Sequence, residues 1–242
     1  MGERTFKHSG ALGDIIYSLP TIKALGGGIL YLDIEGGKDE PAITGERGDG
    51  RIRFDRRGYD TIRPLLLEQP YLRDVAIWEH QPVDHDLNDM RKVPASRGAF
   101  RILDAFYASQ FPPGSVAPDG PWLTLKSQPI KLPKPIIVNR TGRYQQKDAR
   151  WEMNKSHWLP NGIFIGLEIE HRMFQHTFDC KIGFYKTNDA LEIARVLLGA
   201  KMLIANQSFV MAIAIGLGIP FIQETYESMA DCVFKRPNAQ YF

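Results

Sequence analysis

The sequence predicts an α/β protein of two lobes, each built on a doubly wound parallel sheet. A strand, a glycine-rich turn, a helix and a second apolar strand follow one another between residues 4 and 34, which is the order of a βαβ unit. A proline-rich segment occupies residues 112–135, and the same alternation of strands and helices starts again after it. A chain of 242 residues is long enough for two such lobes.

The elements of the first lobe follow from apolar runs and helical periodicity. The apolar run ILYLDI is nearly continuous, which is typical of a strand buried in a parallel sheet. Three glycines end the helix that precedes it. The expected elements are, in chain order, a strand at 4–8, a helix at 15–25, a strand at 29–34, a loop at 36–58, a helix at 59–69, a strand at 74–79 and a helix at 96–111.

A boundary between the lobes is expected in the proline-rich segment. Its prolines cannot donate to a sheet, and only residues 122–125 (WLTL) resemble a strand there. We therefore expect lobes at residues 1–125 and 134–242. The elements expected in the second lobe are strands at 135–140, 162–167, 201–208 and 219–224 and helices at 169–178, 188–200 and 209–218, the helix at 188–200 being capped by Thr187 or Asn188.

Composition and charge are those of a globular protein without a transmembrane segment. Hydrophobic residues make up 43% of the chain and charged residues 24%, and no run approaches the ~18 apolar residues of a membrane span. The first residues lack the apolar core of a secretory signal, and the two cysteines form no CxxC pair. The expected localisation is cytoplasmic. A net charge of +2 is too small to indicate nucleic-acid binding by itself.

The segment HSGALGDIIYSLP, residues 8–20, carries an acidic residue at the end of a glycine-rich turn. Such turns commonly bind phosphate, but this one lacks the Walker lysine and the full GxGxxG spacing. The carboxylate of Asp14 would repel a phosphate. The turn therefore predicts a different ligand, with Asp14 either acting on that ligand or capping a helix that begins at Ile15.

A polar turn of the second lobe, formed by Asn206, Gln207 and Ser208, lies between an apolar strand and an apolar helix. The N-terminus of a helix presents unpaired N–H groups and the positive end of the helix dipole, and this arrangement binds a diphosphate without a metal. Ser208 would add a hydroxyl donor. The alternative is a plain N-cap on a packed helix.

Cationic and hydroxyl residues follow the first strand of the second lobe. The segment VNRTGRYQQKDARW places Arg140, Thr141, Arg143 and Lys147 near the carboxyl end of that strand, where ligands of α/β proteins bind. Cations there would neutralise a leaving diphosphate. Glu224 ends another strand and is expected to accept hydrogen bonds from ribose hydroxyls. Solvated loop residues are the alternative in both cases.

The segment HSGALGDIIYSLPTIKAL resembles the opening of glycosyltransferase family 9, the heptosyltransferase-like enzymes whose GT-B fold has two Rossmann-type lobes facing a central cleft. The segment LLEQPYLRDVAIWE, with DHDLNDMR after it, is similar to the family's third strand and its following loop. The segment LLGAKMLIANQSFVMAIAIGLGIPFIQE is similar to a late strand, turn and helix. The chain is shorter than is typical of the family. The family's small-residue loop, its Gly-Asp pair and its proline correspond to Ser9, Gly10, Gly13, Asp14 and Pro20.

One departure from the family concerns the polar turn. Many members carry an Asp-Ser-Gly type of turn followed by a histidine, whereas this chain has Asn206, Gln207, Ser208 and Phe209. The family's donor contacts therefore carry over only in part. The resemblance also accounts for DHDLND, whose composition is that of a metal site, as a strand that passes into a loop, and no metal is expected there.

The resemblance implies a glycosyltransferase that moves a sugar from a nucleotide-diphosphate sugar to an acceptor hydroxyl. The reaction would invert the sugar and would need no metal, and no cofactor apart from the donor substrate is expected. Asp14 would take the acceptor's proton as general base. Ser9, Gly10 and Gly13 would let the acceptor approach the backbone, so the first lobe is the acceptor side and the second lobe the donor side. Thr141 and Lys147 match hydroxyl and lysine residues of the family's donor loop.

Several alternatives remain open. The family implies a saccharide acceptor, but a modified base in DNA is a second acceptor. A non-catalytic nucleotide or nucleotide-sugar binder would agree with the short chain and the altered turn. An epimerase or hydrolase of sugar nucleotides is a further alternative on the same fold. The DNA alternative is favoured by a group of arginines, Arg47, Arg51, Arg53, Arg56 and Arg57.

Overall fold

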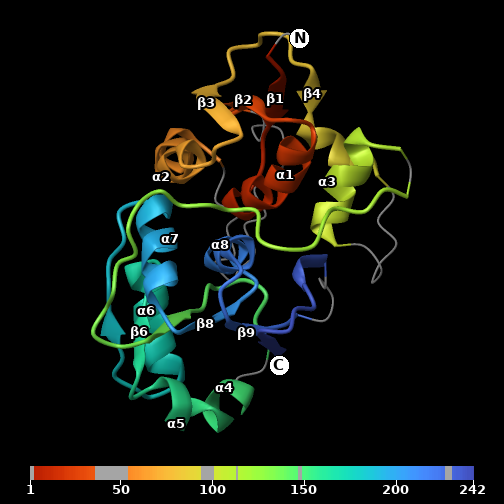
Figure 1. Ribbon diagram of the computed structural model, residues 1–242. Helices are drawn as coiled ribbons and strands as arrows, with labels where there is room; N and C mark the ends of the chain where they lie inside the picture. The colour runs from red at the N-terminus through yellow and green to blue at the C-terminus, as the bar shows by residue number, and fades with distance from the viewer. Residues whose placement is uncertain (1–2, 36–53, 94–100, 113, 147–148, 227–230) are drawn as a thin grey trace. The chain divides into compact units, whose positions relative to one another are not determined.

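A computed structural model describes residues 3–35, 54–93, 101–112, 114–146, 149–226 and 231–242 (Figure 1). The chain divides into two compact units, Met1–Lys126 and Ser127–Phe242. Each unit contains one sheet whose strands are all parallel. The predicted α/β class with two parallel sheets is therefore confirmed.

The first unit has a four-stranded sheet in the order β3-β2-β1-β4. Phe6 of β1 pairs with Leu30 of β2 on one side and with His85 of β4 on the other. The strand order therefore reverses direction at β1. The elements are β1 (Thr5–His8), α1 (Leu12–Ala24), β2 (Gly28–Leu32), α2 (Arg56–Leu67), β3 (Leu72–Ile77), β4 (His85–Asp86), the 3₁₀-helix η1 (Leu87–Lys92) and α3 (Ile102–Gln110).

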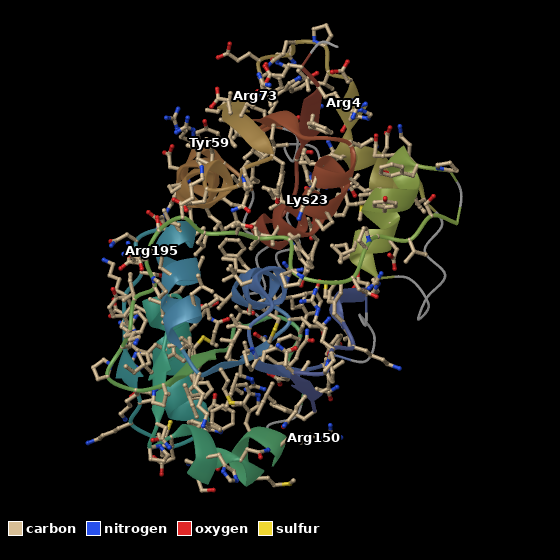
Figure 2. The ribbon with its side chains drawn as sticks, in the orientation of Figure 1. Arg4, Lys23, Tyr59, Arg73, Arg150 and Arg195 are labelled. Carbon is tan, nitrogen blue, oxygen red and sulfur yellow. The ribbon has the colours of Figure 1, made fainter. Side chains whose placement is uncertain are left out.

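Helix α1 lies in the core of the first unit. All its residues from Ile15 to Ile22 are buried, and it packs against α3. The indole of Trp122 donates to the carbonyl of Ile16 over 3.0 Å, which ties the end of this unit to α1. Helix α2 is bonded to the sheet, because the hydroxyl of its Tyr59 (labelled in Figure 2) donates to the carbonyl of Val75 in β3 over 2.9 Å.

The second unit has a six-stranded sheet in the order β10-β9-β8-β5-β6-β7. Strand β5 lies between β8 and β6, so the order reverses direction at this strand as well. The elements are β5 (Ile136–Asn139), α4 (Ala149–Met153), α5 (Lys155–Trp158), β6 (Gly162–Phe164), α6 (Glu168–Thr177), β7 (Gly183–Phe184), α7 (Ala190–Gly199), β8 (Met202–Asn206), α8 (Phe209–Leu217), β9 (Phe221–Glu224) and β10 (Ala239–Tyr241).

Aromatic side chains fill much of the core of the second unit. Trp151 and Trp158 are buried with three phenylalanines, and the indole of Trp158 donates to the carbonyl of Trp151 over 3.1 Å. Helix α8 is buried from Val210 to Gly216. Arg195 on α7 (Figure 2) donates to the carbonyl of Gln128 over 2.8 Å, which attaches the first residues of this unit to α7.

Several element boundaries differ from those predicted. Helix α1 begins at Leu12 and not at Ile15, and α2 begins three residues early because the carboxylate of Asp55 caps it by accepting from Gly58 N over 2.9 Å. Helix α7 is capped by Asp189, and not by Thr187 or Asn188 as predicted. A side-chain cap can fix the first turn of a helix earlier than apolar periodicity indicates.

Residues 122–125 do not form the predicted strand. The backbone of Thr124 instead exchanges two hydrogen bonds with the side-chain amide of Gln69, of 3.0 and 3.2 Å, so a side chain replaces a neighbouring strand. The short elements β4, η1, α4, α5, β7 and β10 were not predicted as separate elements. In the part of the chain that the structure describes, no helix has both the length and the apolar character needed to cross a membrane.

Candidate functional site

The carboxyl end of β1 is the reversal point of the first sheet, because β2 and β4 flank it on opposite sides. Ligands of open α/β sheets bind at such points. Ser9 follows β1 directly, and its N–H and hydroxyl both donate to Oδ1 of Asn88, over 3.1 and 3.0 Å. Arg91 donates to the carbonyl of Ser9 over 2.9 Å and to Asn88 Oδ1 over 3.1 Å. The glycine-rich turn is therefore fixed by the segment after β4.

Asp14 lies in the first turn of α1, two residues after the helix begins. Ala11 occupies the N-cap and makes no side-chain capping bond, so the alternative in which Asp14 caps a helix starting at Ile15 is wrong. A carboxylate in the first turn is favoured by the helix dipole, which stabilises its charged form. Gly13 is the helical residue before it. Asp14 is partly buried.

Gly10 leaves room for two side chains that approach it. A Cβ atom at this position would lie 2.9 Å from Cε1 of His8 and 3.5 Å from Oδ2 of Asp14. The first distance is shorter than real Cβ contacts, so an alanine would push the His8 ring or the turn aside. The small residue therefore allows the carboxylate and the imidazole to be held close to the same turn.

His8 is buried beneath the turn, with 1% of its surface exposed. Burial lowers the pKa of His8 to about 4, and the charge of Arg91 adds to this, while backbone groups of Ser9 and Asp14 oppose it. The ring is neutral at pH 7. Neither ring nitrogen forms a hydrogen bond with any residue that the structure describes. Buried polar atoms without partners are uncommon in folded proteins.

The acidic segment DHDLND has other partners for its charged groups. Asp84 accepts from the N–H and hydroxyl of Thr5, both over 2.8 Å, and Asp89 pairs with Lys92 at 2.5 Å. Asp86 accepts from the N–H of Asn88 over 2.9 Å. Across the described ranges, no group of three or more histidine, cysteine or acidic residues is placed to hold a metal ion.

The reversal point of the second sheet lies between β5 and β8, and Asn206 ends β8 there. Its side chain is fully buried and bonds the loop after β5. Oδ1 accepts from the N–H of Thr141 over 3.0 Å, and Nδ2 donates to the carbonyl of Thr141 over 3.1 Å and to the carbonyl of Arg143. Asn206 therefore fixes the loop that carries Thr141, which is itself half-buried.

Ser208 is the N-cap of α8, and its hydroxyl accepts from Met211 N over 3.3 Å while it donates to Asn139 Oδ1 over 2.8 Å. Asn139 ends β5, so the cap also joins the two central strands. The first backbone N–H groups of a helix have no partner within the helix. Gln207, just before the cap, accepts from the N–H of Tyr226 over 2.7 Å.

Arg140 and Glu224 form a buried ion pair. Nε and a terminal nitrogen of Arg140 donate to the two carboxylate oxygens of Glu224, over 2.8 and 2.7 Å. The carboxylate also accepts from the N–H of Gln146 over 2.7 Å. The side chains are 3% and 0% exposed. Glu224 therefore has protein donors where the sequence suggested a ribose, and Arg140 directs its charge at this carboxylate and not at solvent.

The other cationic residues of the loop are placed differently. Arg143 is half-buried, donates to the hydroxyl of Tyr144 over 2.7 Å and lies with Cζ 4.7 Å from the centroid of that ring. Lys147 lies outside the described residues, as do Arg47, Arg51 and Arg53. Arg56 is on α2 and pairs with Asp60 at 3.1 Å, and Arg57 is exposed next to it.

Apart from Lys147, which is not described, the structure thus brings the residues predicted for the donor to the carboxyl ends of the strands of the second sheet, from segments more than sixty residues apart. It also adds residues that the sequence did not single out. In the first unit, these are Asn88, which belongs to the acidic segment DHDLND, and Arg91, which follows that segment by two residues. In the second unit, the additional residues are Asn139, Tyr144, Gln146 and Tyr226.

Similarity to solved structures of other proteins supports the fold class. No family model matches the chain, and no curated protein does. Among solved structures, a glycosyl transferase family 9 protein from Veillonella parvula is similar with a TM-score of 0.60 and 11% identity, covering 99% of this chain and 85% of that one. The ADP-heptose lps heptosyltransferase II of E. coli is similar with a TM-score of 0.59 and 10% identity, over 100% and 90%.

A third similar structure is the E. coli heptosyltransferase WaaC with ADP-2-deoxy-2-fluoro heptose, at a TM-score of 0.58 and 11% identity, over 98% of this chain and 92% of that one. These likenesses extend over both units of the chain. At such low identity they show the fold, which is that of GT-B glycosyltransferases, and they assign no residue of this chain to a role.

Proposed function

We propose that this protein is a glycosyltransferase that moves a sugar from a nucleotide-diphosphate sugar to an acceptor hydroxyl. The observation that carries the proposal is the arrangement of Asn206, Ser208 and Thr141 with the N-terminus of α8 at the reversal point of the second sheet. The fold likeness to heptosyltransferases over nearly the whole chain supports the same class of reaction.

The second unit is proposed to hold the donor. The backbone N–H groups at the start of α8 and the positive end of its dipole favour a diphosphate. The hydroxyl of Ser208 caps the helix and donates to Asn139, and the hydroxyl of Thr141 is bonded to the side chain of Asn206, so both hold the turn at this end of the sheet in place. Arg140 and Glu224 are not assigned to the donor, because they are buried and bonded to each other. In this proposal they support the loop on which Thr141 lies.

The first unit is proposed to supply the base. In a single displacement, the acceptor oxygen forms a bond to the anomeric carbon while the bond from that carbon to the diphosphate oxygen breaks. The diphosphate leaves with the electron pair, and the acceptor proton passes to the carboxylate of Asp14. This route inverts the anomeric carbon. Helix N–H groups stabilise the leaving diphosphate, so the proposed mechanism requires no metal ion.

The acceptor proposed is a saccharide, handled in a cytoplasmic reaction. If the acceptor is instead a modified base in DNA, the protein should bind a DNA duplex. Affinity for a DNA duplex carried by arginines falls steeply as salt rises, because counterions are released on binding. A saccharide-specific enzyme should show no such salt-dependent affinity for DNA.

Replacing the carboxylate tests the mechanism. In Asp14→Asn, transfer should fall by about 10²–10⁴-fold, which is the usual contribution of a general base. Donor binding, measured by calorimetry, should stay within about twofold of the wild-type value, since the donor lies on the other unit. Asp60→Asn is the matched control, because Asp60 is an exposed acid paired with Arg56 on α2.

The outcomes separate the alternatives. Unchanged transfer by Asp14→Asn would rule out this residue as the base. A wild-type protein that converts the donor without an acceptor is a hydrolase or an epimerase. A wild-type protein that binds donor but transfers nothing to any acceptor is a non-catalytic binder. Failure to bind any nucleoside diphosphate or its sugar would reject the proposed function itself.

A further inference from the structure

Two tyrosines form an aromatic surface near the N-terminus of α8. The ring centroids of Tyr144 and Tyr226 are 5.9 Å apart, and the ring planes meet at 44°. Tyr226 is 36% exposed, and Tyr144 is half-buried. Tyr226 lies in the loop two residues after β9, and a large aromatic side chain this exposed has no evident role in the core of the unit. We call the pair the tyrosine platform.

Both tyrosines are held in place by neighbouring polar groups. The hydroxyl of Tyr144 accepts from Arg143, whose guanidinium also lies 4.7 Å from the ring centroid. The N–H of Tyr226 donates to Oε1 of Gln207, the residue directly before the N-cap Ser208. The tyrosine platform is therefore connected by one hydrogen bond to the turn proposed to bind the diphosphate.

The buried ion pair joins the two loops that carry the tyrosine platform. Arg140 is the first residue after β5, in the loop of Tyr144, and Glu224 is the last residue of β9, just before the loop of Tyr226. Gln146 adds two further bonds, from its N–H to Glu224 over 2.7 Å and from its side-chain amide to the carbonyl of Thr225 over 2.6 Å. Together with the buried ion pair, these bonds fix the separation of the two loops.

The backbone of Tyr144 is strained. Its φ of 50° lies in the left-handed region, which aromatic residues seldom adopt. Such a conformation persists only where the surrounding contacts impose it, and it is concentrated at ligand sites. Around Tyr144, Arg143 donates to its hydroxyl, Gln146 bonds the loop to Glu224, and the ring lies against that of Tyr226.

We propose that the tyrosine platform stacks the base of the nucleoside diphosphate, an inference that rests on the proposed donor site. Aromatic side chains bind nucleobases through their ring faces, whatever the base. A base inserted between two rings needs a centroid separation of about 7 Å, twice the usual stacking distance. The observed 5.9 Å is too short for this, so the base lies on the exposed face of Tyr226. The guanidinium of Arg143 adds positive charge next to an anionic ligand.

The test compares two ligands that differ in the base. Calorimetry would measure binding of ADP and of inorganic pyrophosphate to the full chain. In Tyr226→Ala, affinity for ADP should fall about tenfold or more, while affinity for pyrophosphate stays within about twofold. Tyr226→Phe keeps the ring and should bind ADP as the wild type does. Tyr185→Ala, directly after the edge strand β7, is the control for loss of a tyrosine elsewhere in this unit.

A second variant tests the strained residue. Tyr144→Asn removes the ring while keeping a residue that tolerates positive φ, and it should also weaken ADP selectively. Equal loss of ADP and pyrophosphate in Tyr226→Ala would show that the tyrosine only supports the loop, and would overturn the inference. Unchanged ADP affinity in both variants would overturn it while leaving the donor site standing. If the wild type binds pyrophosphate but not ADP, the nucleotide donor itself is rejected.

Discussion

At the scale of single residues, His8 is the feature that sequence patterns could not describe. A histidine before a glycine-rich turn is visible in the sequence, but its burial and its lack of hydrogen-bond partners among the described residues depend on packing against the ring of Phe106, 5.2 Å away. The same holds for Gly10, whose small size is explained only by the positions of His8 and Asp14.

His8 makes the stability of the first unit depend on pH. The folded-state pKa of about 4 lies below the ordinary 6.5. Between these pH values, His8 is therefore protonated in the unfolded chain and neutral in the folded one. The free energy of unfolding should therefore fall as pH drops from about 6.5 to 4. The contribution of His8 over this range is about 3 kcal/mol, at ~1.4 kcal/mol for each unit of pKa.

Urea unfolding at several pH values would measure this effect. Carboxylates titrate in the same range, so the wild type is compared with His8→Leu, which cannot bind the proton. From pH 7 to pH 4, the unfolding free energy of the wild type should fall by about 3 kcal/mol relative to that of His8→Leu. If the two proteins instead keep a constant difference across this range, His8 is not the buried neutral group that the structure shows.

At the scale of elements, the sequence placed most helices and strands within a few residues. Helix α1 was predicted to start at Ile15, because Gly13 and Asp14 suggested that the turn continued. The structure includes both in the first helical turn, and this places Asp14 where the helix dipole favours its charge. Strands β7 and β10 of the second sheet are only two and three residues long. They are too short for an alternation of apolar and polar residues to be detected in the sequence.

The pairing of Arg140 with Glu224 joins the loops that follow β5 and β9, and its loss should be costly. Glu224→Ala leaves a buried guanidinium without a carboxylate, and we expect a loss of about 3–5 kcal/mol in unfolding free energy. The double variant Arg140→Met, Glu224→Leu removes both charges and should recover most of that loss. Urea unfolding measures both values.

An exposed ion pair in the same unit gives the matched control. Arg172 and Glu168 on α6 are 3.1 Å apart, with side chains 63% and 70% exposed. Glu168→Ala should change stability by less than about 1 kcal/mol, because water already screens this pair. If Glu224→Ala were no more harmful than Glu168→Ala, the loops after β5 and β9 would not depend on the buried pair.

At the scale of the whole molecule, the sequence predicted the fold class because the alternation of strand and helix occurs twice along the chain. That pattern is local and visible without contacts. The partners within the site are not local. Arg140 and Glu224 are 84 residues apart, and they meet because β8 alone lies between β5 and β9 in the sheet. No periodicity encodes that order, so the sequence indicated that these residues follow strands but not the bonds between them.

The proposed donor site also predicts which of the two units a nucleotide protects from hydrogen exchange. If the donor binds as proposed, ADP at about a hundred times its Kd stabilises the bound state by about 2.7 kcal/mol. Hydrogen exchange followed by mass spectrometry would locate this effect. Slower exchange is expected in residues 139–146, 206–212 and 224–226, which hold the loops, the start of α8 and the end of β9.

The glycine-rich turn of the first unit is the reference in the same hydrogen-exchange experiment. Residues 9–15 hold the glycine-rich turn and Asp14, and a nucleotide without an acceptor should leave their exchange rates nearly unchanged. Protection that is greater there than at the start of α8 would place the diphosphate on the first unit. The carboxylate of Asp14 makes that placement unfavourable, because two anionic groups would then share one turn without a cation between them. Protection at the edge of the second sheet is therefore the result that the charges of the two sites predict.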